Sequence, residues 1–259
     1  MPHQESFSMS ESIVTAPTPS DHIDKSESKV CGMFTEIASR YDFVNRLLSC
    51  GIDVWWRHVT VSSAPPPPQG SVLDVCTGTG DLAMAYAAKA SPGVRIVGSD
   101  FCRPMLSYGM KKSEAADLEI EWVEADATEL PFLDNEFDVV SVAFGLRNIV
   151  DTHKGLSEMA RVLKPGGRLA ILEFSLPSNK FVRSVYLWYF RHVLPFIGNR
   201  ITGNHSEAYT YLNKSVEEFP SGNSLKNIIE SAGFKDVAMM PLTFGIATLS
   251  VAIRDENHA

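Results

Sequence analysis

The chain has 259 residues, 44% hydrophobic and 21% charged, and its 31 acidic against 23 basic side chains give a formal net charge of −8. This composition is typical of a soluble globular protein, and a chain of this length buries a sizeable core without disulfides or metals. The acidic balance disfavours nucleic acid as a partner, because phosphate backbones are bound by clustered Lys and Arg. No stretch approaches the roughly 18 apolar residues of a membrane span, and the amino terminus lacks a signal-peptide pattern, so we expect a cytoplasmic protein.

The four cysteines are widely spaced along the chain, at Cys31, Cys50, Cys76 and Cys102. None forms a CxxC pair, so the sequence predicts neither a zinc site nor a disulfide framework, and it fits a reducing compartment. No cluster of His, Asp or Glu at ligand spacing indicates another metal.

Three segments precede the main domain. Residues 1–28 are rich in Ser, Thr, Pro and acidic residues without an apolar period, which predicts a disordered tail. Residues 29–64 carry apolar side chains at helical spacing, which predicts a helical segment. Residues 65–70, Pro-Pro-Pro-Pro-Gln-Gly, form a stiff linker that neither a helix nor a central strand accommodates.

Strand and helix patterns alternate through residues 71–254, with a short tail at 255–259. Repeated βα units predict an α/β fold with a mostly parallel, doubly wound sheet covered by helices on both faces. The last two strands should close this seven-stranded sheet as an antiparallel pair. The expected strands are 71–75, 94–98, 119–123, 137–142, 168–174, 237–242 and 247–253.

An aromatic segment, residues 178–218, interrupts this alternation before the last two strands. Its pattern is helical, and its position makes it a natural lid over a binding site. A core-facing helix is the alternative.

A glycine-containing loop follows the first strand. Gly78 and Gly80 permit a sharp turn and a close approach of a ligand to the backbone, and Asp100 ends the next strand, where a carboxylate can accept hydrogen bonds from ribose hydroxyls. The same glycine pattern also fits a dinucleotide site.

Two further carboxylates distinguish these ligands. Asp74 puts an anion beside the glycine loop, which suits a ligand with cationic amino and sulfonium groups better than a pyrophosphate. Asp126 follows the third strand, where it could accept a hydrogen bond from an adenine amino group. Each carboxylate alone could be a helix cap, but together they predict an S-adenosylmethionine (SAM) site.

With these residues the chain resembles Rossmann-like class I SAM-dependent methyltransferases. Three segments narrow the resemblance to the ubiquinone/menaquinone biosynthesis C-methyltransferase family, over about residues 30–254. They are Tyr41-Asp42-Phe43-Val44-Asn45 with Trp55-Trp56, Phe144-Gly145-Leu146-Arg147-Asn148, and Arg161–Leu169 continuing to Leu172-Glu173-Phe174-Ser175.

The resemblance assigns cofactor contacts to several positions of this chain. The sequence departs from the family pattern at Val44, Asp53 and Cys76, and Ala143 stands where some members have Ser. The implied cofactor-binding residues are Asp74, Gly78, Thr79, Gly80, Asp100, Asp126, Ala127 and Ala143.

The resemblance also implies an acceptor side. Arg147 and Asn148 follow a predicted strand end and are the candidate catalytic residues, Arg147 to stabilise a phenolate and Asn148 to orient it. The alternative for Arg147 is a buried ion pair with Glu173 that holds the loop. The other candidate substrate-binding residues are Tyr41, Asn45, Glu173, Ser175 and Tyr209.

The implied reaction is transfer of a methyl group from SAM to a ring carbon of a demethylated polyprenyl quinol, in menaquinone or ubiquinone synthesis or both, without a metal. Conversion of demethylmenaquinol to menaquinol is the favoured form of this reaction. The partners implied are the quinol, a membrane surface touched near Arg183 and Arg191, and a second copy or other quinone-synthesis enzymes. The alternatives are a methyltransferase for another small molecule, and a non-catalytic SAM-binding scaffold.

Overall fold

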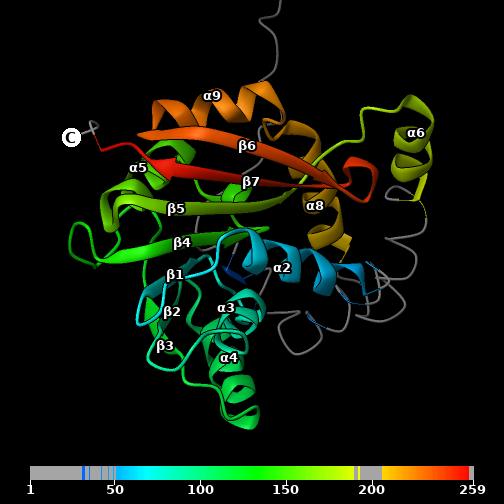
Figure 1. Cartoon of the computed structure of the whole chain (residues 1–259). Helices are drawn as coiled ribbons and strands as arrows, with labels where there is room; N and C mark the ends of the chain where they lie inside the picture. The colour runs from blue at the N-terminus through cyan, green and yellow to red at the C-terminus, as the bar shows by residue number, and fades with distance from the viewer. Residues whose placement is uncertain are drawn as a thin grey trace, which may run out of the picture.

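The computed structural model describes residues 31, 32, 35, 42, 46, 49, 51–189, 192 and 206–256. Within them, one seven-stranded sheet has the order β3-β2-β1-β4-β5-β7-β6 (Figure 1). Strands β1 to β5 are parallel, and β7 runs antiparallel to both β5 and β6. The strands are β1 (Ser71–Val75), β2 (Arg95–Asp100), β3 (Glu121–Glu124), β4 (Phe137–Ala143), β5 (Leu163–Phe174), β6 (Phe234–Leu242) and β7 (Ala247–Arg254).

Helices cover both faces of this sheet, as the βα alternation predicts. One face packs against α5 and α9 and the other against α2 and α3, and the central strand residues alternate between the two resulting cores. The helices are α2 (Ile52–Ser63), α3 (Asp81–Ala87), α4 (Arg103–Ala115), η1 (Leu146–Asn148), α5 (Thr152–Val162), α6 (Lys180–Trp188), α8 (Ser206–Glu218), α9 (Asn223–Ser231) and η3 (Thr243–Gly245).

The predicted α/β fold and its antiparallel carboxyl-terminal pair are confirmed, with local differences. Strand β5 begins at Leu163, which pairs with Phe137, and the pairing then shifts so that Arg168 pairs with Val139. Gly166, at φ 73°, allows the intervening residues to bulge out of the ladder. The sequence therefore predicted this strand five residues too short, because Lys-Pro-Gly-Gly is typical of a turn between elements.

Helices lie in both predicted helical segments. Helix α2 starts after Gly51, at φ 77°, and ends at Ser63, within the segment predicted for residues 29–64. Helix α6 buries only Tyr186, so it is not the core-facing helix considered as an alternative. Helix α8 packs on η1.

Candidate functional site

A cavity of about 500 Å³ lies at the carboxyl ends of the parallel strands. Open α/β sheets bind ligands at this edge, and the volume suits a small molecule or cofactor. Seven of the eight predicted cofactor residues line the cavity. They are Asp74, Gly78, Thr79, Asp100, Asp126, Ala127 and Ala143.

Gly80, the eighth, does not line the cavity but forms part of the turn of the glycine loop. It precedes α3 at φ 80°, and a Cβ there would lie 2.2 Å from the Trp122 ring. A larger residue would therefore displace either the ring or the turn.

Asp100 is held by the loop that it faces. Its Oδ2 accepts a hydrogen bond from the Gly78 backbone at 2.8 Å, and its Oδ1 accepts one from the Cys102 backbone at 2.8 Å. Burial raises the pKa of this carboxyl to about 6, although both hydrogen bonds favour the charged form. Hydrogen bonds from a ribose would favour that form further.

Asp74 lies in the middle of the cavity wall, on β1. It accepts hydrogen bonds from Thr77 Oγ1 at 2.6 Å and Ser141 Oγ at 2.7 Å, and only 1% of the residue is exposed. Burial raises its pKa to about 6, although the hydrogen bonds from Thr77 and Ser141 and the charge of Arg57 favour the carboxylate.

Asp126 and Thr79 carry local contacts that the sequence did not indicate. Both carboxylate oxygens of Asp126 accept hydrogen bonds from Thr128, from its backbone at 2.8 Å and its hydroxyl at 2.6 Å. The Thr79 hydroxyl donates to Asp42 Oδ1 at 2.5 Å, and Lys112 bridges Asp42 and Asp81. Asp42 of the amino-terminal segment is thus joined to the glycine loop by a hydrogen bond and to α4 by an ion pair.

The two candidate catalytic residues, neighbours in η1, face different surroundings. Asn148 lines the cavity, and its Oδ1 accepts a hydrogen bond from the Tyr211 hydroxyl of α8 at 3.1 Å. Arg147 is 4% exposed and is absent from the cavity lining. Its Nη1 pairs with Glu173 Oε1 at 2.8 Å and donates to the Phe144 carbonyl, and its Nε donates to Ser215 at 3.3 Å.

The remaining candidate substrate residues are not brought to the cavity within the described part of the chain. Glu173 is buried against Arg147, and Ser175 donates to the Gly245 carbonyl at 2.9 Å. Tyr41 and Asn45 lie outside the described residues, and only the backbone of Tyr209, in α8, is described. The Glu173 pairing is the alternative that the sequence left open for Arg147.

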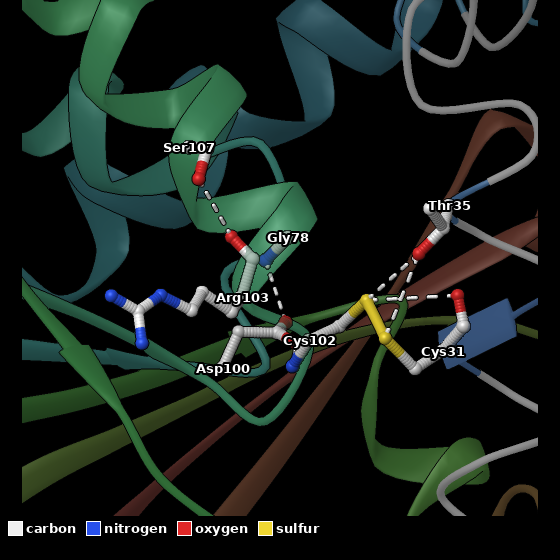
Figure 2. Close-up of a disulfide and its surroundings, with 7 residues drawn as sticks. All are labelled: Cys31, Thr35, Gly78, Asp100, Cys102, Arg103 and Ser107. Carbon is white, nitrogen blue, oxygen red and sulfur yellow. Dashed lines mark hydrogen bonds between the residues drawn. A yellow bond between two sulfur atoms is a disulfide. The ribbon is translucent and has the colours of Figure 1, made fainter.

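The prediction of unpaired cysteines is wrong for two of them. Cys31 and Cys102 form a disulfide, with Cα atoms 5.3 Å apart. Figure 2 shows the bond beside Asp100 and Gly78, with the Thr35 hydroxyl 3.7 Å from Cys31 Sγ and 3.6 Å from Cys102 Sγ. Sequence spacing could not show this contact, because the two residues are 71 positions apart and only the fold joins them.

Several cavity residues were assigned no role by the sequence, among them Arg57, Asp81, Phe144 and Lys154. Phe144 belongs to a quoted motif, but Arg57 and Lys154 lie on helices whose pattern indicates only packing. Among the described residues, no three His, Cys, Asp or Glu side chains are grouped to hold a metal. No helix in that part of the chain is long and apolar enough to cross a bilayer.

Solved structures share this fold. A SAM-dependent methyltransferase from Aquifex aeolicus matches at a TM-score of 0.57 and 20% identity, over 76% of this chain and 89% of that one. A SAM-dependent methyltransferase from Thermotoga maritima matches at 0.60 and 17% identity, over 86% of this chain and 98% of that one.

Curated relatives are much closer in sequence. A demethylmenaquinone methyltransferase of Thermus thermophilus is 49% identical over 86% of this chain and 100% of its own length. A ubiquinone/menaquinone biosynthesis C-methyltransferase of Geobacter sulfurreducens is 47% identical over 85% of this chain and 86% of its own. The family model described as the ubiE/COQ5 methyltransferase family matches residues 22–254. The chain therefore belongs to the ubiE/COQ5 methyltransferase family and is a SAM-dependent methyltransferase.

Proposed function

We propose that the protein transfers the methyl group of SAM to a ring carbon of a demethylated polyprenyl quinol, converting demethylmenaquinol to menaquinol. The similarity to the Thermus relative along that relative's full length carries this proposal. The Geobacter name covers both quinones, so the methoxy-benzoquinol precursor of ubiquinone is the second acceptor to test.

The chemistry requires an activated carbon nucleophile. Bound SAM supplies an electrophilic methyl group on a positively charged sulfur. The quinol gives up a phenolic proton, and its ring carbon forms the new C–C bond as the methyl–sulfur bond breaks and S-adenosylhomocysteine leaves. The hydrogen on that ring carbon is then lost as a proton and the oxygen takes up a proton, which restores the aromatic quinol. The protein must align the two partners and exclude water from them.

The cavity residues divide this work between two ends. Asp100 and Asp126, at β2 and after β3, hold the nucleoside, and Asp74 beside β4 offers negative charge to the cationic part. Asn148 stands at the acceptor end, and Tyr211 occupies its carbonyl oxygen. The Asn148 amide N–H groups are then directed to the phenolic oxygen or to the water that takes its proton.

Arg147 has a positioning role in this proposal. Its guanidinium is committed to Glu173, to the Phe144 carbonyl and to Ser215 of α8, so it fixes η1 between β4, β5 and α8. Asn148 is thereby held at the cavity without direct contact between Arg147 and the phenolate.

A competition assay tests the acceptor. Purified protein receives labelled SAM and both demethylated quinols in reduced form, and we expect label in menaquinol. Asn148→Ala should lower kcat about 100-fold, with SAM affinity nearly unchanged. Label in the methoxy-benzoquinol alone would contradict the proposed acceptor, and label in neither quinol would favour the scaffold alternative.

A peripheral membrane contact would give access to such an acceptor. Aromatic side chains are exposed on α2, α6 and η3, at Trp55, Phe181, Trp188 and Phe244. These elements adjoin, because Trp56 donates to Thr243 at 2.8 Å and Gly245 lies against Pro177. Arg183 on α6 is also exposed, whereas Arg191 lies outside the described residues. An apolar surface with adjacent basic charge suits an anionic lipid interface.

A further inference from the structure

Arg57 of α2 is a largely buried cation in the wall of the methyl-donor cavity. Its side chain is 11% exposed, and its guanidinium carbon lies 5.7 Å from the centre of the Phe144 ring. Burial of a charged group is costly unless partners compensate it. Two carboxylates, Asp53 at 2.5 Å and Asp81 at 3.6 Å, lie near this guanidinium, and Arg46 shares both of them.

The cavity is otherwise strongly acidic. Two cationic side chains, Arg57 and Lys154, contribute to its wall. The carboxylates of the wall are Asp74, Asp81, Asp100, Asp126 and Asp151. Such a wall suits the sulfonium and ammonium groups of the donor, but it repels the carboxylate at the same end of that molecule. A zwitterionic ligand therefore needs one cation placed beside its carboxylate.

Arg57 lies at the aminoacyl end of the cavity. The nucleoside end is marked by Asp100 and Asp126, at β2 and after β3, so the rest of the donor extends toward β1 and β4. Arg57 stands there, over Phe144 just after β4 and 3.6 Å from Asp81 just after the glycine loop.

Lys154 lies elsewhere in the cavity wall. The residue that follows it, Gly155, is against Ile149 and the Ala127 carbonyl, next to Asp126 on the nucleoside side. Arg57 is thus the cavity cation within reach of the aminoacyl end among the described residues.

The contacts of Arg57 fix its plane and leave donors for a ligand. Nη1 donates to Asp53 Oδ2, one helical turn earlier, at 2.5 Å. Nη2 faces Asp81 Oδ2 at 3.6 Å, which is too long for a hydrogen bond. A guanidinium has five N–H donors in a planar fork that matches a carboxylate.

We infer that Arg57 binds the α-carboxylate of the methyl donor, with Asp53 as the residue that orients its guanidinium. This inference rests on the use of SAM and not on the identity of the acceptor. It predicts that the affinity contributed by Arg57 depends on whether the ligand has a carboxylate.

Calorimetric titration with two product-like ligands tests this dependence without any acceptor. S-adenosylhomocysteine keeps the aminoacyl end, and 5′-methylthioadenosine lacks it. Arg57→Gln should weaken S-adenosylhomocysteine about 10- to 100-fold and methylthioadenosine by less than about twofold. Arg95→Gln, a control whose side chain pairs with Glu121 and Glu136 outside the cavity, should leave both affinities unchanged. Equal losses for both ligands, or no loss for S-adenosylhomocysteine, would overturn the inference.

A second experiment changes the ligand and uses the native protein, so it remains valid if Arg57→Gln does not fold. Decarboxylated S-adenosylhomocysteine retains the ammonium group and the nucleoside, and we expect it to bind the native chain about 10- to 100-fold more weakly than the parent ligand. Equal binding of the two would refute the role of Arg57. Because no quinol is present, a chain that fails to methylate quinols would still give these results.

Discussion

Asp74 illustrates how a buried site group affects stability. Burial disfavours its charged form and raises its pKa from the ordinary value of 3.8 to about 6. The native state therefore binds the proton more tightly than the unfolded chain does. Protonated Asp74 stabilises the fold fully below pH about 4, and this contribution is lost as pH rises through about 6. The loss amounts to about 3 kcal/mol.

We predict that Asp74→Asn flattens the pH dependence of stability in the ligand-free protein. In urea unfolding between pH 4.5 and 7.5, the free energy of unfolding of the variant should increase relative to that of the native chain as pH rises. SAM affinity should also fall in the native chain below pH 6, because the cation loses a charged partner. Asp100, with the same shift from the same cause, accounts for the remaining slope, so Asp100→Asn is the companion variant. Parallel curves for native chain and Asp74→Asn would refute this account.

The Arg147–Glu173 pair is a second case at the residue scale, since both side chains are almost completely buried. Removal of one partner leaves an unpaired buried charge, whereas replacement of both by apolar residues is far better tolerated. This difference separates a structural contribution from a functional one.

We expect Glu173→Gln to lower the free energy of unfolding by about 3–5 kcal/mol. The double variant Arg147→Met/Glu173→Leu should recover most of that stability in chemical denaturation but not the turnover, because η1 loses the contacts that fix Asn148. Full recovery of kcat in the double variant would show that the pair has no positioning role. Arg147→Ala with normal stability, normal SAM affinity and lost turnover would instead indicate direct contact with the acceptor.

At the scale of elements, the disulfide attaches the amino-terminal segment to the turn that opens α4. Cys102 also donates its backbone N–H to Asp100, so the attachment point adjoins the predicted ribose ligand. A bond that closes a loop of this length stabilises mainly by restricting the unfolded chain.

We predict that reduction by a dithiol lowers the free energy of unfolding by about 4 kcal/mol and weakens S-adenosylhomocysteine binding. Denaturation and calorimetry with and without reductant measure both effects. Cys31→Ala is the control: it should resemble the reduced native chain and should not respond to reductant. If reductant changed the stability and affinity of Cys31→Ala as much as those of the native chain, a group other than this disulfide would be responsible.

The whole molecule presents two opposite ends of its sheet. Phe244 lies where β7 begins, at the carboxyl end of β5, because Ala247 pairs with Phe174. Leu133 is similarly exposed but precedes the amino end of β4. Helix α6 lies near the first of these ends (Figure 1). The proposed membrane contact there is formed by the exposed aromatic residues Phe181, Trp188 and Phe244.

Vesicle flotation tests that contact. The triple variant Phe181→Ser/Trp188→Ser/Phe244→Ser should reduce the fraction bound to anionic vesicles at least about tenfold, since each buried aromatic side chain contributes about 1.5–3 kcal/mol. The matched control Leu133→Ser should bind like the native chain. If the native chain fails to float with anionic vesicles, the membrane contact is excluded.

The sequence determined the fold class and most of the cofactor site, because both depend on local order along the chain. Strand and helix periods specify a doubly wound sheet, whose parallel strands bring their carboxyl ends to one edge. The glycine loop and Asp126 each follow a strand and Asp100 ends one, so their convergence follows from the fold class alone. The start of β5 was predicted too late, because Lys-Pro-Gly-Gly is typical of a turn but here forms a bulge within the strand.

Only the tertiary structure decided contacts between elements distant in sequence. Arg57 reaches the cavity from a helix whose pattern indicates packing, and Cys31 meets Cys102 across 71 positions. Neighbouring residues were also separated: a short 3₁₀ turn directs Asn148 into the cavity and Arg147 toward Glu173. The physical reason is that a side chain's direction depends on backbone angles and on what packs against it, and the order of residues specifies neither directly.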